Sequence, residues 1–245
     1  MSETPAPMKP VALDPKKHKG LKIKQVGSTD HIETSHYAKV YTQEFAKAGV
    51  DSPIVFVKGP EGDFMSAVMW GLQPGENLFV KDGMWTGGFF PAYVRSFPFI
   101  ISPNPQKDGH FYIGLYEDSD YVNAEEGMLL FNEDGSETDY LKDTKDFLVQ
   151  IYQNEEFTRT FLKKLDSLGL LVLKTVLVKN PNTGEDKDVG GFYVVDKEKL
   201  AQLTDEVYLE LRHSGELESI YAHLMSLETL YKLVRIKEGN DQQQS

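Results

Sequence analysis

The sequence predicts an α+β protein, with a β-rich N-terminal half and a C-terminal half of long helices packed on a two-stranded hairpin. Up to about residue 140, short apolar runs alternate with turns that contain glycine and proline. At 141–168 and 216–237, apolar residues recur three or four positions apart, which is the period of an amphipathic helix. Between these stretches, β-branched runs at 170–178 and 191–195 predict the hairpin.

This pattern divides the chain into four parts. We expect disordered tails at 1–10 and 238–245, a β-rich region at 11–140, and a helical region at 141–237 that contains the hairpin 170–195. The two regions form either one compact domain, 11–237, or two closely joined ones.

In the N-terminal half, the run at 78–102 has the densest apolar and aromatic content, and we expect the other strands to be organised around it. Within it, Lys81-Asp82-Gly83 predicts a tight hairpin, because glycine accepts the positive φ that a primed turn requires. The apolar runs at 53–57, 64–72 and 110–116 predict three further strands.

In the C-terminal half, Gly169 is placed to end the first long helix in a left-handed conformation. Asp196 and Thr204 are expected to cap two short helices after the hairpin. The last helix presents an apolar seam, which packs most simply on the helix near 148–168. The seam consists of Leu217, Ile220, Leu224 and Leu227.

Charge and composition exclude several classes of protein. The net charge of −12 would repel nucleic-acid phosphates, so no nucleic acid is expected as a partner. No apolar run approaches the roughly 20 residues that span a bilayer. The first residues lack the apolar core of a secretion signal. We therefore expect a soluble, cytoplasmic protein, and the lack of cysteine excludes disulfides and thiolate metal sites.

The charge is unevenly distributed along the chain. Residues 1–24 contain six lysines against Glu3 and Asp14, a charge of +4, which leaves −16 on the remaining 221 residues. This basic arm can fold onto the acidic body of its own chain, bind an acidic partner, or remain a solvated tail, and we favour the first alternative.

Arg95 stands alone in an aromatic run, where a guanidinium needs acceptors for its donors. Asp118, with Glu117 beside it, begins the loop after the neighbouring strand and offers the nearest carboxylates. We favour a structural ion pair between them. The alternative is that Arg95 awaits an anionic ligand, such as a peptide carboxylate.

The predicted ligand-binding set is Trp85, Arg95, Asp118 and His223. Trp85 lies beside two glycines, and we expect it to be partly exposed. His223 flanks the seam of the last helix, where a half-buried histidine with one hydrogen bond is the usual alternative to a base or ligand.

A metal site is the alternative to this set. His31 and Glu33 would share one face of a strand, and with a distant histidine they would resemble a two-His, one-carboxylate iron site. Ordinary surface residues explain the same pattern. Apart from this alternative site, we expect no metal and no cofactor.

Five ordered motifs extend nearly from one end of the chain to the other. They are Leu13-Asp14-Pro15-Lys16-Lys17-His18-Lys19-Gly20-Leu21, Pro74-Gly75-Glu76-Asn77-Leu78-Phe79 with Trp85 and Arg95-Ser96-Phe97-Pro98-Phe99, Phe131-Asn132-Glu133-Asp134-Gly135, Gly190-Gly191-Phe192-Tyr193, and Ile220-Tyr221-Ala222-His223-Leu224-Met225-Ser226-Leu227. Together they resemble the bacterial SapC family. An unrelated peptide-transporter permease has the same name, but it needs several membrane helices.

The resemblance implies an association with bacterial surface-layer proteins. It also implies a flavin-dependent, halogenase-like protein as a partner, because genes for such proteins commonly lie near those of the family. It carries over no catalytic residues.

We expect a non-catalytic accessory protein that binds a peptide, protein or aromatic ligand in a groove near Trp85 and Arg95. The first alternative is a metal- or cofactor-assisted, non-haem enzyme that uses histidine and carboxylate side chains. The second is a surface-layer-associated protein.

Overall fold

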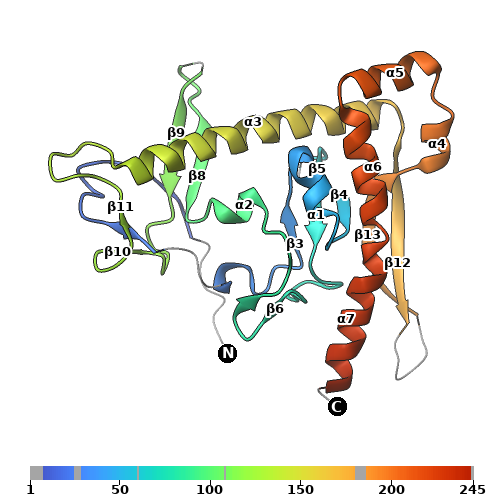
Figure 1. Cartoon of the computed structure of the whole chain (residues 1–245), viewed down its shortest axis with the longest axis horizontal. Coiled ribbons are helices and arrows are strands. Elements are labelled where there is room, and N and C mark those ends of the chain that lie inside the picture. The colour runs from blue at the N-terminus through green and yellow to red at the C-terminus, as the bar shows by residue number, and fades with distance from the viewer. Residues whose placement is uncertain (1–7, 25–28, 60, 108, 180–185, 244–245) are drawn as a thin grey trace. The chain divides into compact units, whose positions relative to one another are not determined.

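The computed structural model describes residues 8–24, 29–59, 61–107, 109–179 and 186–243 of the chain (Figure 1). The chain forms two compact units. The first contains Met1–Gly27 and Arg95–Gln153, and the second contains Ser28–Val94 and Asn154–Ser245. Strands dominate the N-terminal half and helices the C-terminal half, so the predicted α+β class is confirmed.

The second unit is built on a five-stranded antiparallel sheet with the order β12-β13-β4-β5-β3. Its strands are β3 (Tyr37–Lys39), β4 (Ile54–Lys58), β5 (Phe64–Met69), β12 (Leu171–Lys179) and β13 (Asp186–Val195). β4 and β5 are the strands expected at 53–57 and 64–72, and β12 and β13 pair as the predicted hairpin. The turn expected at 180–184 lies outside the described residues.

A small hairpin also belongs to the second unit. β6 (Val80–Lys81) and β7 (Met84–Trp85) flank the predicted turn, in which Asp82 and Gly83 have φ angles of +52° and +72°. Both values are those of a primed turn, as the Asp-Gly pair predicted. The run at 78–102 does not organise the main sheet, because it forms β6, β7, the short helix α2 (Ala92–Arg95) and β8 (Phe99–Pro103), none of which joins the five strands.

The first unit contains two small antiparallel sheets, with the orders β1-β9-β8 and β10-β2-β11. The remaining strands are β1 (Val11–Ala12), β2 (Lys22–Ile23), β9 (Phe111–Leu115), β10 (Val122–Asn123) and β11 (Met128–Leu129). The long helix α3 (Asp139–Ser167) belongs to the first unit as far as Gln153 and to the second unit beyond it. It continues through Asn154 without a break.

The basic arm folds onto acidic residues of its own unit, which confirms the favoured alternative. The contacts are ion pairs of Lys17 with Glu117 and Lys24 with Glu126, and hydrogen bonds from Lys19 and Lys22 to the carbonyl groups of Glu133 and Glu125. Ile23 and His18 are buried, 2% and 0% exposed, so the arm is also anchored by apolar packing.

Four helices follow the hairpin of the second unit: α4 (Lys197–Ala201), α5 (Asp205–His213), α6 (Glu216–Ser226) and α7 (Thr229–Gln243). Asp196 caps α4 and Thr204 caps α5 through their side-chain oxygens, as predicted. Gly215, with φ +78°, forms the left-handed turn between α5 and α6. α7 continues to Gln243, through most of the segment expected to be a tail.

The last helix was predicted as one element, and the structure instead interrupts it at Leu227 and Glu228 to give α6 and α7. The seam is the inner face of α6, since Ile220 and Leu224 are buried. Its partner differs from the prediction, because α6 packs mainly on α1 (Phe45–Ala48), α5, β4 and β13 rather than on α3. The apolar period identifies which face of a helix is buried, but not what covers it.

Candidate functional site

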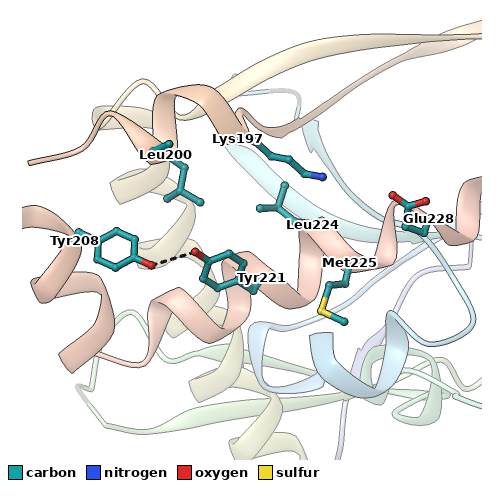
Figure 2. A pocket seen from close by; sticks show the side chains of 8 residues that line it. Lys197, Leu200, Tyr208, Tyr221, Leu224, Met225 and Glu228 are labelled. Carbon is teal, nitrogen blue, oxygen red and sulfur yellow. Dashed lines mark hydrogen bonds between the residues drawn. The ribbon is translucent and has the colours of Figure 1, made fainter. Parts of the chain in front are cut away.

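A groove opens on the second unit where α4, α5 and α6 meet (Figure 2). Its volume is about 560 Å³, within the range of roughly 300–1,000 Å³ that is usual for small-ligand sites. We call it the α4–α6 groove. It is lined by Lys197, Leu200, Ala201, Tyr208, Tyr221, Leu224, Met225 and Glu228.

The middle of the α4–α6 groove is apolar. Leu200 and Leu224 are buried, whereas Met225 is 74% exposed and Tyr221 is 44% exposed. The thioether of methionine is flexible and polarisable, and such side chains are common at adaptable binding surfaces. The groove therefore presents uncovered apolar surface that can fit side chains of different shape.

A pair of tyrosines closes one end of the groove. The hydroxyl oxygens of Tyr208 and Tyr221 lie 3.0 Å apart and share one hydrogen bond (Figure 2). This bond, together with partial burial, raises the pKa of Tyr221 above its ordinary value. Only one hydroxyl donates within the pair, so the other retains a proton that it can donate to a ligand.

Opposite charges lie toward the other end. Figure 2 shows the side chain of Lys197 extending toward the end of the groove where Glu228 stands. Neither residue forms an ion pair with any residue that the structure describes. A positive and a negative group are therefore available at the same end of an apolar groove.

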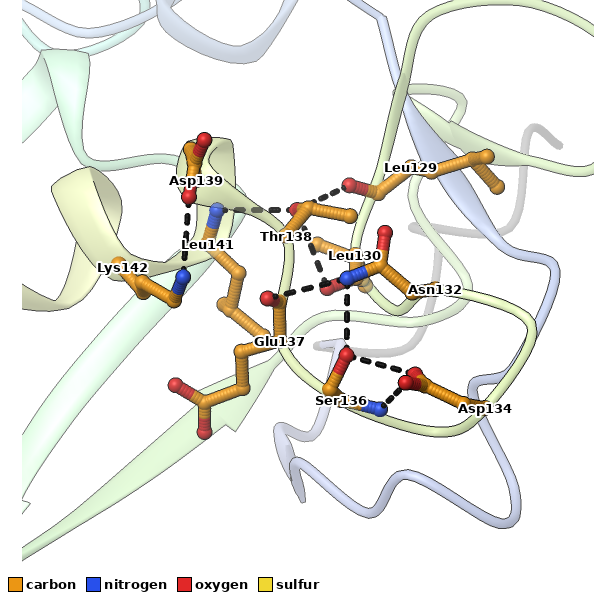
Figure 3. Close-up of polar contacts among 10 residues, drawn as sticks. All are labelled: Leu129, Leu130, Asn132, Asp134, Ser136, Glu137, Thr138, Asp139, Leu141 and Lys142. Carbon is orange, nitrogen blue, oxygen red and sulfur yellow. Dashed lines mark hydrogen bonds and ion pairs between the residues drawn. The ribbon is translucent and has the colours of Figure 1, made fainter.

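A second hollow, of about 900 Å³, lies in the first unit around the start of α3. Most of its polar groups bond to one another (Figure 3). The Asn132 amide donates to the Ser136 hydroxyl, and the Thr138 hydroxyl donates to the Leu129 carbonyl and caps α3 through the N–H of Leu141. These contacts stabilise the turn before α3, so the α4–α6 groove is the better candidate for a ligand.

Trp85 lies within an aromatic cluster and is half-buried, which confirms the expected partial exposure. Its ring centre is 4.7 Å from that of Trp70, 5.5 Å from Phe79 and 5.2 Å from Phe90. A Cβ on Gly87 would come within 2.7 Å of the indole, so glycine permits this close packing. The indole N–H has no hydrogen-bond partner among the described residues.

His223 is fully buried on α6. Its Nε2 accepts a hydrogen bond of 3.1 Å from the N–H of Val195, and its Nδ1 lies 2.9 Å from the carbonyl oxygen of Ile54. The ring also stacks on Phe56, with 4.5 Å between the ring centres. Burial lowers the pKa of His223 to about 4. Both ring nitrogens are therefore used to hold α6 on the sheet, which leaves neither for a ligand.

Arg95 is exposed, and its guanidinium lies 5.1 Å from the centre of the Phe147 ring. The predicted ion pair is wrong, since neither Asp118 nor Glu117 lies within ion-pair distance of it among the described contacts, and Glu117 bonds Lys17 instead. The hydrogen bond from Lys17 lowers the pKa of Glu117. Arg95 needs no carboxylate because it reaches water from the end of a short helix and stacks on an aromatic ring.

The four predicted ligand-binding residues are divided between the two units. Trp85 and His223 belong to the second unit, whereas Arg95 and the exposed Asp118 belong to the first. Neither unit brings all four together.

His31 and Glu33 do not share the face of a strand. His31 lies in the short 3₁₀ helix η1 (Asp30–Ile32), and Glu33 is its exposed C-cap. Burial lowers the pKa of His31. In the part of the chain that the structure describes, no three histidine, aspartate or glutamate side chains gather in a way that could hold a metal ion.

The residues of the α4–α6 groove were not identified from the sequence. A usable pattern was present, because Tyr221 and Met225 are four positions apart on α6 and lie off its buried seam. Two large apolar side chains on the outer face of an amphipathic helix indicate a surface that is covered by something else.

Comparison with known proteins identifies the family and nothing narrower. No helix among the described residues has the length and apolar character needed to cross a membrane. No curated protein and no solved structure shows significant similarity to the chain. A family model described as SapC matches residues 13–233, nearly the whole chain, and the protein therefore belongs to the SapC family.

Proposed function

We propose that the protein is a non-catalytic binding protein that holds a large apolar or aromatic side chain of its ligand in the α4–α6 groove. The observation that supports this most directly is the exposure of Met225 and Tyr221 beside the buried Leu200 and Leu224. Covering such surface is favourable by roughly 25 cal/mol per Å² of apolar area removed from water.

The construction of the site supports binding more than chemistry. Three helices position the groove: Asp196 and Thr204 cap α4 and α5, and Gly215 forms the turn into α6. Regular elements hold a binding surface more accurately than long loops do. The histidine on the same helix, His223, faces the sheet and is engaged there by backbone groups. The hydroxyl pair and the two charged groups orient a ligand, and the apolar middle provides affinity.

The test uses an uncharged probe, N-acetyl-L-phenylalaninamide, titrated into protein carrying ¹³C-methyl-labelled methionine. The Met225 methyl resonance, assigned by Met225→Leu, should shift with saturation. Tyr221→Ala should weaken binding by about fivefold or more, the effect of losing roughly 1 kcal/mol of aromatic contact.

Tyr231→Ala is the matched control, because Tyr231 is 69% exposed on α7 and lies outside the groove. Its affinity for the probe should equal that of the unmodified protein. A Met225 resonance that does not move up to the solubility limit of the probe would refute the proposed function.

A further inference from the structure

We infer that the ligand of the α4–α6 groove is a free α-amino acid with a large apolar side chain. This inference rests on the proposed function and specifies the ligand. Its basis is the order of chemical groups along the groove: opposite charges toward one end, apolar surface in the middle and a hydroxyl pair at the other end (Figure 2).

The charged end matches a zwitterion. An α-amino acid carries an ammonium and a carboxylate on one carbon, so both must be met at the same end of its site. Lys197 supplies the cation for the carboxylate and Glu228 the anion for the ammonium. A residue within a peptide carries neither backbone charge, and a peptide terminus carries one. The paired charges therefore favour the free amino acid over a peptide.

An exposed pair of opposite charges is ordinarily solvated and contributes little to stability. Lys197 and Glu228 differ from such a pair in their position, since both line the same apolar groove and neither is used by an ion pair with a described residue. Ligand binding would displace water from this end and strengthen both interactions.

The length of the groove sets the size of the side chain. Tyr221 and Met225 are four positions apart on α6, which corresponds to about 6 Å along the helix, and Glu228 lies two residues beyond its end. An amino acid anchored near Glu228 extends its side chain over Leu224 and Met225 toward the Tyr208–Tyr221 hydroxyls. Phenylalanine and leucine reach across the apolar middle, whereas alanine does not.

The experiment compares L-phenylalanine with N-acetyl-L-phenylalaninamide, which has the same side chain but no charges, by the Met225 methyl titration. L-phenylalanine should bind at least about tenfold more tightly, and L-alanine should not bind measurably. Lys197→Gln and Glu228→Gln should each weaken L-phenylalanine binding by about tenfold and leave the uncharged probe unaffected.

Lys163→Gln and Glu198→Gln are matched controls, because both residues are exposed on nearby helices and neither lines the groove. Both variants should bind L-phenylalanine as the unmodified protein does. Equal binding of the charged and uncharged compounds would overturn the inference and leave the proposed function standing. Failure of both compounds to shift Met225 would overturn both.

Discussion

The imidazole of His223 takes the place of a direct bond between two strands. β13 and β4 are antiparallel with Tyr193 opposite Phe56, and this register sets Val195 opposite Ile54. At that position the ring lies between the strands, accepting from the Val195 N–H and reaching the Ile54 carbonyl. Since an N–H donates to Nε2, the neutral ring carries its proton on Nδ1 and donates it to Ile54.

This arrangement predicts an acid-sensitive contribution to stability. The pKa of His223 is about 4 in the folded chain and about 6.5 for an unperturbed histidine. The unfolded chain therefore binds a proton below pH 6.5 while the folded chain resists protonation until pH 4. The stabilising contribution is complete above pH 6.5 and is lost as the pH falls toward 4.

Between pH 7 and pH 5, the free energy of unfolding should fall by about 2 kcal/mol more in the unmodified protein than in His223→Gln. Urea denaturation of both proteins at both pH values measures this difference. The carboxylates titrate alike in the two proteins, so their contribution is removed when one loss is subtracted from the other. Equal losses in the two proteins would show that His223 titrates alike in the folded and unfolded chains.

The roles of single residues were the least predictable from the sequence, because each role depends on contacts with residues that are distant in the chain. His223 depends on Ile54, 169 positions away, and Glu117 bonds Lys17, 100 positions away. From sequence proximity, Glu117 and Asp118 were expected to pair with Arg95. The sequence near Glu117 does not indicate that Lys17, in the N-terminal arm, forms the ion pair with Glu117 instead.

At the scale of the element, α6 connects the core to the candidate site. Ile220 on its inner face is completely buried, while the next residue, Tyr221, is 44% exposed and lines the α4–α6 groove. Two adjacent residues are therefore divided between a role in folding and the proposed role in binding. Adjacent positions on a helix point about 100° apart, which makes this division possible.

The two faces of α6 should respond differently to truncation. Ile220→Ala should lower the free energy of unfolding by about 2–5 kcal/mol, since it removes buried methyl groups and leaves a cavity. Tyr221→Ala should change it by less than about 1 kcal/mol, because the side chain is 44% exposed and lies outside the core. Chemical denaturation of both variants tests this, and a similar loss in the two would place the groove face within the core.

Locally encoded elements were predicted well. The Asp82-Gly83 hairpin and the caps at Asp196 and Thr204 depend on residues within a few positions of one another. The interruption of the helix between Ser226 and Thr229 was missed, because the apolar period continues through it. The packing of α6 on the sheet was also missed, since a period defines a face and not its partner.

At the scale of the whole molecule, each unit is assembled from two separate stretches of chain. Composition changes along the sequence, but it does not indicate that residues 1–27 belong with 95–153. Contacts such as the pairing of β1 with β9 bring these stretches together, and they join residues about 100 positions apart. The asymmetry of charge did point to one such contact, between the basic arm and an acidic body.

The relative strength of the contacts that hold this arm is the last prediction. Its ion pairs are exposed at the surface, and such pairs are worth about 0–1 kcal/mol each. Burial of Ile23 is worth more, and Ile23→Ala should cost about 2 kcal/mol or more. Hydrogen exchange of residues 11–24, followed by mass spectrometry, should therefore accelerate by about 30-fold in Ile23→Ala and by less than about fivefold in Lys24→Ala. Raising the salt concentration to about 1 M should accelerate exchange only as much as Lys24→Ala does, and less than Ile23→Ala does. Salt screens the ion pairs but does not expose Ile23. A larger acceleration in Lys24→Ala than in Ile23→Ala would mean that charge, rather than apolar burial, holds the arm.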